Sequence, residues 1–222
     1  MAVAAVESMH GAVCAHAAES DATMEDSESY ERGMASAVAA LSAGLPVVFP
    51  TDTVYGLGVA VGMAKSPEVL YDIKRRDHGK PVAWLVGTPD ALSLYGEFAH
   101  ILARTFWPGP LTLIVKAGLN VPEPFQSQSG TIALRMPDNA LALRLIERVG
   151  FPLATTSANI SGQKPPRVFG ELDPALLREV TVALRDDTEK SGVASTVLDC
   201  TGDHPAMVRE GGISIADIQA LG

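Results

Sequence analysis

A short apolar run that ends at a proline and continues into hydroxyls, a carboxylate and glycines constrains this chain more than any other feature. Residues 47–49 (VVF) follow Gly44-Leu45-Pro46 and precede Pro50, which is typical of a short buried strand. The next residues, 51–58 (TDTVYGLG), are predicted to form a loop at the end of that strand. Such a loop can present backbone amides and hydroxyls to a polar or anionic ligand, although the same residues also suit a plain turn.

The negative charge of the chain is concentrated near its N-terminus. The 222 residues carry a net charge of −9, and residues 1–33 account for −6 of it. Residues 1–28 are predicted to be an acidic, poorly ordered segment, without the basic start and apolar stretch of a secretory signal. Residues 29–222 contain no dividing linker and are predicted to form one domain, since 47% hydrophobic residues supply an ample core. No stretch approaches the length of a membrane span, so no membrane association is expected.

The cysteines and histidines do not indicate a metal centre. Cys14 and Cys200 form no CxxC motif, and the five histidines have no metal-ligand spacing. We therefore expect a cytoplasmic protein with reduced thiols, no catalytic cysteine and no protein-bound metal site.

The rest of the chain alternates between strand and helix patterns. Helices are predicted at residues 29–43, 66–73, 89–95, 100–106, 139–149, 174–180 and 215–221. Strands are predicted at residues 47–49, 82–86, 111–115, 131–135, 153–159, 181–184, 195–199 and 206–209. Several strands follow one another with only short loops between them. This order predicts a mixed α/β (α+β) fold, with helices packed on one mixed sheet.

Polar residues lie at several predicted strand ends, where sheet proteins usually bind ligands. They occur at 51–55, 131–135 and 155–159, and we expect them to converge. The basic residues Lys74, Arg75, Arg76 and Lys80 are either a solvated helix end or a clamp for a polyphosphate. Neither a Walker loop nor a GxGxxG motif is present, so side chains would have to hold any nucleotide phosphates.

Arg135 ends an apolar strand, and a buried arginine requires an anionic partner. That partner is expected to be either Asp138 or the carboxylate of a ligand. Residues 107–110 (WPGP) are interpreted as a rigid turn with the indole packed on the core. No Ser/His/Asp arrangement is visible, so covalent catalysis is not indicated.

Seven segments in order resemble the YrdC family of L-threonylcarbamoyladenylate synthases. They are PTDTVYGLG, the Lys-x-Arg of Lys74 and Arg76, WPGPLT, ALRMP, TTSANISG, STVLD and VREGGI, and they extend from about residue 34 to the C-terminus. The resemblance implies a twisted mixed sheet with a deep, positively lined cavity. It also implies an enzyme that condenses L-threonine, bicarbonate or CO₂, and ATP with Mg²⁺ into threonylcarbamoyl-AMP and pyrophosphate. The product would feed the machinery that transfers threonylcarbamoyl to adenosine in tRNA.

The resemblance also implies roles for individual residues. The catalytic cations would be Lys74, Arg76 and Lys80. The threonine contacts would be Thr51, Thr53, Tyr55, Arg135, Thr155 and Ser195. The ATP contacts would be Arg76, Lys80, Thr131, Ser157, Asn159, Pro165 and Arg209.

Two features depart from the family pattern, and two other functions stay open. Val82 follows Lys80-Pro81 where leucine is usual, and Leu85 lies near the position of a histidine in longer members, so the chain resembles the short, single-domain form. One alternative is a module that binds tRNA or double-stranded RNA, against which the negative charge and the aromatic content of 5% argue. The other is a protein of the same fold with a different acceptor.

Overall fold

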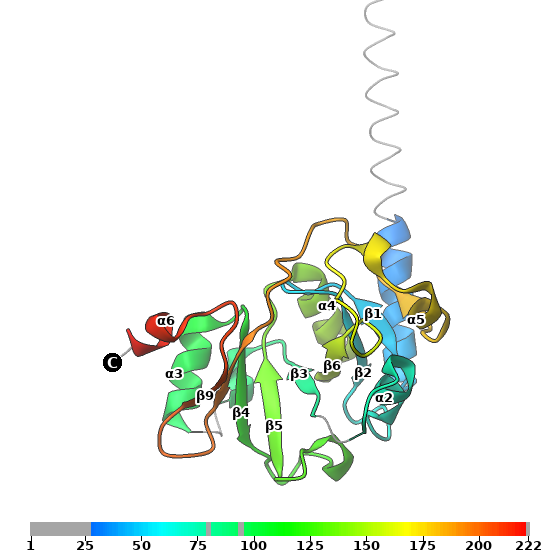
Figure 1. The fold of residues 1–222 in the computed structure, drawn as a ribbon. Coiled ribbons are helices and arrows are strands. Elements are labelled where there is room, and N and C mark those ends of the chain that lie inside the picture. Colours follow the sequence, from blue (N-terminus) through cyan, green and yellow to red (C-terminus); the bar gives the residue numbers. More distant parts are fainter. Residues whose placement is uncertain (1–27, 79–80, 93–95, 221–222) are drawn as a thin grey trace, which may run out of the picture. The chain divides into compact units, whose positions relative to one another are not determined.

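The computed structural model describes residues 28–78, 81–92 and 96–220 (Figure 1). The predicted acidic segment 1–28 thus lies almost wholly outside the described residues, as does Lys80. Residue contacts divide the chain into two units, Met1–Ser36 and Ala37–Gly222. Residues 28–42 are helical, as predicted, and the backbone turns at Gly44 with a φ of 74°. The remaining description concerns the second unit.

A single mixed sheet of nine strands forms the centre of this unit. Its order is β7-β1-β2-β6-β3-β5-β4-β8-β9, with parallel pairs at β1–β7, β3–β5 and β4–β8 and antiparallel pairs elsewhere. The strands are β1 (Val47–Phe49), β2 (Gly56–Ala60), β3 (Ala83–Leu85), β4 (Leu111–Lys116), β5 (Thr131–Arg135), β6 (Leu153–Ser157), β7 (Val182–Ala183), β8 (Thr196–Asp199) and β9 (Ala206–Arg209). The predicted mixed sheet is therefore confirmed.

Helices cover the sheet and enclose the core. They are α2 (Glu68–Lys74), α3 (Glu97–Phe106), α4 (Ala140–Val149), α5 (Pro174–Arg178) and α6 (Ile215–Gln219), with short 3₁₀ turns η1 (Pro89–Leu92), η2 (Glu123–Phe125) and η3 (Phe169–Glu171). In Figure 1, α3 and α6 lie beside β4 and β9, whereas α2 and α5 lie near β1 and β2. No helix among the described residues combines the length and the apolar character needed to cross a membrane.

Helix α4 shows how local sequence sets an element. Asn139 caps its start by accepting a hydrogen bond from the backbone N–H of Ala142, and Gly150 ends it with a left-handed φ of 75°. The buried residues of α4 recur at helical spacing and therefore lie on one face of the helix. Burial of this apolar face holds the helix on the sheet.

Strand β2 corrects the prediction of a loop over residues 51–58. Residues 51–55 do form a loop, but Gly56 to Ala60 are a fully buried strand between β1 and β6. The glycines that suggested a turn instead permit a close approach of the strands, since a Cβ at Gly58 would lie 2.8 Å from Oγ1 of Thr155.

Three helix starts also differ from the prediction. Helix α3 begins at Glu97 rather than at His100. Helix α2 begins at Glu68 rather than Ser66, and its N-cap residue Pro67 makes no side-chain cap. The segment from Pro89 forms a 3₁₀ turn rather than an α-helix, and residues 93–95 of that predicted helix lie outside the described residues. The turn at 107–110 agrees with its interpretation, because Trp107 is buried and its Nε1 donates to the carbonyl of Leu111 at 2.7 Å.

Candidate functional site

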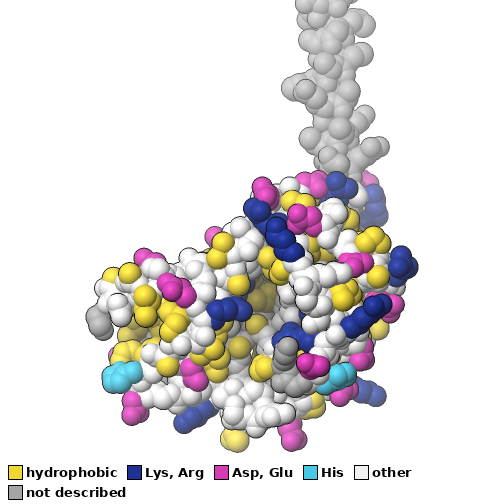
Figure 2. Space-filling model, in the orientation of Figure 1, with side chains coloured by type: hydrophobic (Ala, Val, Ile, Leu, Met, Phe, Trp, Pro, Cys, Tyr) yellow, Lys and Arg dark blue, Asp and Glu magenta, His cyan; other side chains and the backbone are white. Residues whose placement is uncertain are grey.

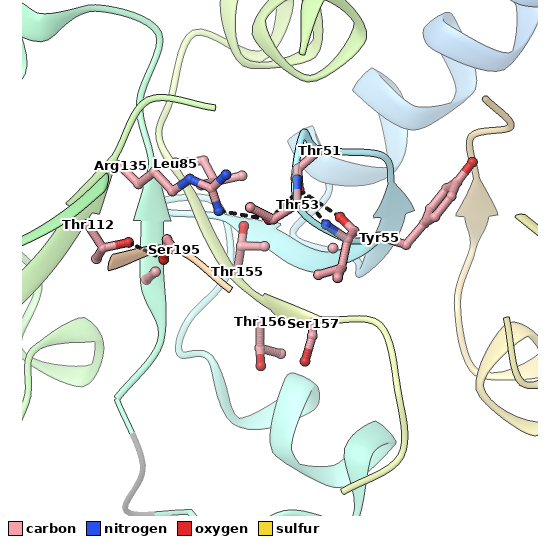
Figure 3. A pocket seen from close by; sticks show the side chains of 13 residues that line it. Thr51, Thr53, Tyr55, Leu85, Thr112, Arg135, Thr155, Thr156, Ser157 and Ser195 are labelled. Carbon is pink, nitrogen blue, oxygen red and sulfur yellow. Dashed lines mark hydrogen bonds between the residues drawn. The ribbon is translucent and has the colours of Figure 1, made fainter. Parts of the chain in front are cut away.

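A pocket of about 110 Å³ opens where the loop before β2 meets the ends of β4, β5 and β6 (Figure 3). Figure 2 shows a hollow on this face of the molecule with lysine and arginine side chains at its edge. The lining is mostly small side chains, many with hydroxyls. It consists of Thr51, Thr53, Val54, Tyr55, Gly56, Ala83, Leu85, Thr112, Arg135, Thr155, Thr156, Ser157 and Ser195. Six predicted threonine contacts and one predicted ATP contact, Ser157, are thereby brought together.

Arg135 supplies the positive charge of the pocket. Its Nη1 donates to Oγ1 of Thr53 at 3.0 Å, its Nε donates to the carbonyl of Gly109 at 3.1 Å, and its Nη2 lies 2.5 Å from Oδ1 of Asp52. Burial lowers the pKa of Arg135, and the carboxylate of Asp52 opposes that shift. The protein partner expected from the sequence was Asp138, and this is wrong. Asp138 is exposed, whereas Asp52 reaches Arg135 from the loop before β2.

The hydroxyl of Thr51 shapes that loop. Its Oγ1 donates to the carbonyl of Val54 at 2.6 Å and accepts from the N–H groups of Thr53 and Val54 at 3.3 Å. These bonds fold residues 51–54 into a tight turn. The turn aims the hydroxyl of Thr53 at Arg135 (Figure 3).

Tyr55 lines the pocket with its ring, but its hydroxyl is engaged elsewhere. The hydroxyl donates to the carbonyl of Asp186 at 2.7 Å and accepts from the N–H of Asp186 at 2.9 Å. Burial raises the pKa of Tyr55 to about 12. The residue therefore contributes shape to the pocket rather than an acid or a base.

Lys74 is turned toward the protein. Its Nζ donates to the carbonyl of Ser157, to the carbonyl of Asn159 at 2.6 Å and to Oδ1 of Asn159 at 3.2 Å. An ammonium has three N–H groups, so these acceptors use all of them. Burial, and then the positive charge of Arg76, lower the pKa of Lys74 to about 8. Of the basic residues in the predicted phosphate clamp, Lys74 therefore binds the protein itself, at the end of β6 and in the loop that follows it.

Arg76 also contacts a residue that lines the pocket. Its Nη1 donates to Oγ1 of Thr156, a pocket residue, at 3.0 Å, and its Nη2 donates to the carbonyl of Pro81 at 3.4 Å. The neighbouring Arg75 has a left-handed φ of 51° at the end of α2, and it is exposed. Composition alone does not separate these two arginines, whereas the Lys-x-Arg motif singled out Arg76.

Ser195 links the pocket to Arg209. The Oγ of Ser195 lies 2.8 Å from Oγ1 of Thr112 and accepts from Nη2 of Arg209 at 3.3 Å. Its carbonyl also accepts from Nε and Nη2 of Arg209 at 3.1 and 2.8 Å. Thr112 was not among the predicted site residues, although it ends the WPGPLT segment and is a threonine within the apolar strand β4.

Four other predicted ATP contacts do not line the pocket. Thr131 lies at the opposite end of β5 from Arg135, and its Oγ1 is 2.6 Å from Oγ of Ser127. Asn159 is buried behind Ser157 and accepts from its hydroxyl at 2.5 Å. Pro165 and Arg209 are exposed. Asn159 and Arg209 thus contact the pocket through Ser157 and Ser195.

The described residues contain no group of three or more His, Cys, Asp and Glu side chains arranged to hold a metal ion.

Together, the fold and the pocket define a mixed α/β protein with a small polar pocket that is lined by hydroxyls and a buried arginine. The family model described as "Telomere recombination" (Sua5/YciO/YrdC) matches residues 39–211. The chain belongs to the Sua5/YciO/YrdC family, which confirms the resemblance seen in the motifs.

Two similar proteins are both named as threonylcarbamoyl-AMP synthases. A putative threonylcarbamoyl-AMP synthase of Mycobacterium tuberculosis is 37% identical, over 85% of this chain and 88% of its own length. The threonylcarbamoyl-AMP synthase of Pyrococcus abyssi is 33% identical over 80% of this chain, but the match covers only 54% of that protein.

Two solved structures have folds similar to that of this chain. The crystal structure of P. abyssi Sua5 complexed with L-threonine has a TM-score of 0.77 and 32% identity, covering 83% of this chain and 56% of that one. Escherichia coli YciO has a TM-score of 0.75 and 27% identity, covering 84% of this chain and 93% of that one.

Proposed function

We propose that this protein is a threonylcarbamoyl-AMP synthase. It would condense L-threonine, bicarbonate or CO₂, and ATP into threonylcarbamoyl-AMP, with release of pyrophosphate. The observation that carries the proposal is the pocket in which Arg135 and a set of hydroxyls converge, in a chain whose relatives bear this name. The relative crystallised with L-threonine supports the same choice of amino acid.

L-Threonine is assigned to the pocket. Its carboxylate would bind Arg135, which uses three of its five N–H groups within the protein and retains two. The hydroxyls of Thr53, Thr155 and Ser195 lie around the same space, and Thr51 and Tyr55 hold its shape. A volume of about 110 Å³ suits a small amino acid.

ATP would extend from the pocket across Ser157 and Arg76. Thr131, Asn159, Pro165 and Arg209 are then nucleotide-side residues, which agrees with their places outside the lining. Because all three N–H groups of Lys74 are engaged, we assign the phosphates to Arg76 and Lys80. Lys74 would act by holding the loop that carries Ser157 and Asn159.

The chemistry follows from charge. The neutral amine of threonine adds to CO₂ and loses a proton, which gives a carbamate. A carbamate oxygen then bonds to the α-phosphorus of ATP while the bond from that phosphorus to the pyrophosphate oxygen breaks. Two anions must meet, so fixed cations that offset their repulsion are the main requirement. Mg²⁺ bound to the phosphates of ATP would supply further positive charge.

The product is a mixed anhydride, which a transfer enzyme would use to modify adenosine in tRNA. We place this reaction in the cytoplasm, where tRNA and ATP are available. The alternative of an RNA-binding module is not favoured, because the relatives are named as synthases.

The test is pyrophosphate release from ATP with purified protein. Release should require both L-threonine and bicarbonate, and L-serine should replace threonine poorly. Release that proceeds equally without threonine would contradict the proposal. Salt-titrated binding of double-stranded RNA, with steep salt dependence and no pyrophosphate release, would favour the RNA-binding alternative.

A matched pair of variants tests the role of Arg76. Arg76→Ala should lower kcat by about a hundredfold or more, as expected when a cation that stabilises a phosphoryl transfer is lost. Arg75→Ala removes the same charge from the neighbouring residue, whose side chain is exposed, and it should leave kcat nearly unchanged. Equal losses in both variants would mean that only the overall positive charge matters.

A further inference from the structure

Thr112 carries a hydroxyl on a strand whose neighbouring positions are apolar. Leu111 and Leu113 are fully buried in the core, whereas Thr112 is 4% exposed and points into the pocket (Figure 3). A buried hydroxyl requires hydrogen-bond partners. It can donate its one proton to one group and accept a hydrogen bond from another.

Two other polar side chains of the pocket lie near Thr112. Leu113 of β4 pairs with Leu134 of β5, so Thr112 and Arg135 are the next facing positions toward the pocket. On the other side, the register of β4 and β8 sets Val197 opposite Thr112. Ser195 lies just before β8, and its Oγ reaches Oγ1 of Thr112 at 2.8 Å.

The hydrogen bonds of these side chains leave one O–H group free. The hydroxyls of Thr112 and Ser195 lie 2.8 Å apart, and a single bond between them uses only one of their two protons. Among the described residues, neither hydroxyl has another acceptor. Nη2 of Arg209 donates to Oγ of Ser195 at 3.3 Å, which favours Ser195 as the donor toward Thr112. The O–H of Thr112 is then available to a ligand in the pocket that Thr112 and Arg135 both line.

We propose that Thr112 is a further substrate-binding residue, and that its hydroxyl donates to the α-carboxylate of the amino acid bound at Arg135. The inference rests on the proposed function. One carboxylate oxygen would bind the guanidinium of Arg135 and the other the hydroxyl of Thr112. Arg209 would support this bond through Ser195, which links a nucleotide-side residue to the amino-acid pocket.

Thr112→Val tests the proposal, because valine keeps the branched shape and removes only the hydroxyl. The KM for L-threonine should rise about tenfold, the loss expected for one hydrogen bond to a charged group, with the KM for ATP and the melting temperature nearly unchanged. Thr112→Ser keeps the donor and should restore most of the affinity for threonine. A merely structural role would instead raise both KM values or lower the melting temperature.

The outcomes separate this inference from the proposed function. If the wild-type protein releases pyrophosphate with threonine and Thr112→Val has the wild-type KM, the role of Thr112 is overturned and the synthase activity stands. If the wild-type protein lacks the activity, the proposed function fails. Calorimetric titration of both proteins with L-threonine then still tests Thr112, and equal affinities, or no binding by the wild-type protein, would overturn the inference.

Discussion

Oδ1 of Asp52 lies 2.5 Å from Nη2 of Arg135, and the two side chains are only 16% and 8% exposed. Asp52 is absent from the lining of the pocket, so its carboxylate holds the guanidinium from behind. The sequence motif that contains Thr51 and Thr53 thus supplies both a hydroxyl and a counter-ion to the same arginine. The pair fixes the direction of Arg135 and balances its charge in a poorly solvated place.

Asp52→Ala should destabilise the protein by about 3–5 kcal/mol, because it leaves the buried charge of Arg135 without a partner. Asp52→Asn should cost less, since its amide oxygen still accepts from Nη2. Urea unfolding measures both. Asp187→Ala is the control, because its ion pair with Arg185 is 74% and 70% exposed, and it should change stability by no more than about 0.5 kcal/mol. Equal stability of the wild type and Asp52→Ala would contradict a buried pair.

The elements that the sequence predicted best are those with local signals. Strand β5 begins and ends where predicted, at Thr131 and Arg135, and α4 has both its asparagine cap and its glycine stop. The convergence of Arg135, Thr155 and Ser157 was also predictable, since polar residues that follow apolar strands gather at sheet ends.

The remainder depends on contacts between distant segments. Asp52 and Arg135 are 83 positions apart, as are Thr112 and Ser195, and a single sequence does not reveal such pairs. Strand β2 was missed for a different reason. Glycine is common in turns, and only the packing against β6 explains its presence in a buried strand.

Gly58→Ala tests that packing. A Cβ at this position would lie 2.8 Å from Oγ1 of Thr155 and 3.0 Å from the carbonyl oxygen of Ala154, so β2 or β6 must shift. We expect a loss of about 1–3 kcal/mol in the free energy of unfolding. Gly170→Ala is the matched control, since a Cβ at Gly170 would meet no atom within 4 Å, and it should be nearly neutral. Equal effects of the two substitutions would contradict the close approach of the strands.

Residues 186–192 hold the loop before β2 in place. The N–H groups of Ser191 and Gly192 donate to the carbonyls of Asp52 and Thr53 at 3.1 and 2.8 Å. Within the segment, Lys190 forms an ion pair with Asp186, and its side chain is only 3% exposed. The Nζ of Lys190 also lies 5.8 Å from the centre of the ring of Tyr55. Lys190 is therefore a positioning residue for the pocket.

Lys190→Met should raise the KM for L-threonine several-fold with little change in the KM for ATP, because the substitution loosens the loop that carries Thr53. Steady-state kinetics with each substrate varied in turn measures the two values. Arg185→Ala, just before this segment and with a side chain that is 70% exposed, should leave both unchanged. If Lys190→Met alters the two KM values equally, the residue supports the fold as a whole rather than the amino-acid pocket.

Lys74 gives the protein a defined response to alkaline pH. Its pKa falls from 10.5 to about 8 on folding, so between these values the unfolded chain binds a proton that the folded chain has released. Stability should therefore rise as the pH increases from about 8 toward about 10, and this gain is lost as the pH falls through 8. Cys200 acts in the opposite direction above pH 9, because burial raises its pKa from 9.0 to about 11. Tyr55 does the same above pH 10, because burial raises its pKa from 10.0 to about 12. Urea unfolding of the wild type and Lys74→Met from about pH 7 to about pH 9 should therefore show a rise only in the wild type. Parallel pH profiles, or an NMR titration of Nζ near its ordinary pKa, would mean that the bonds to Ser157 and Asn159 keep Lys74 charged.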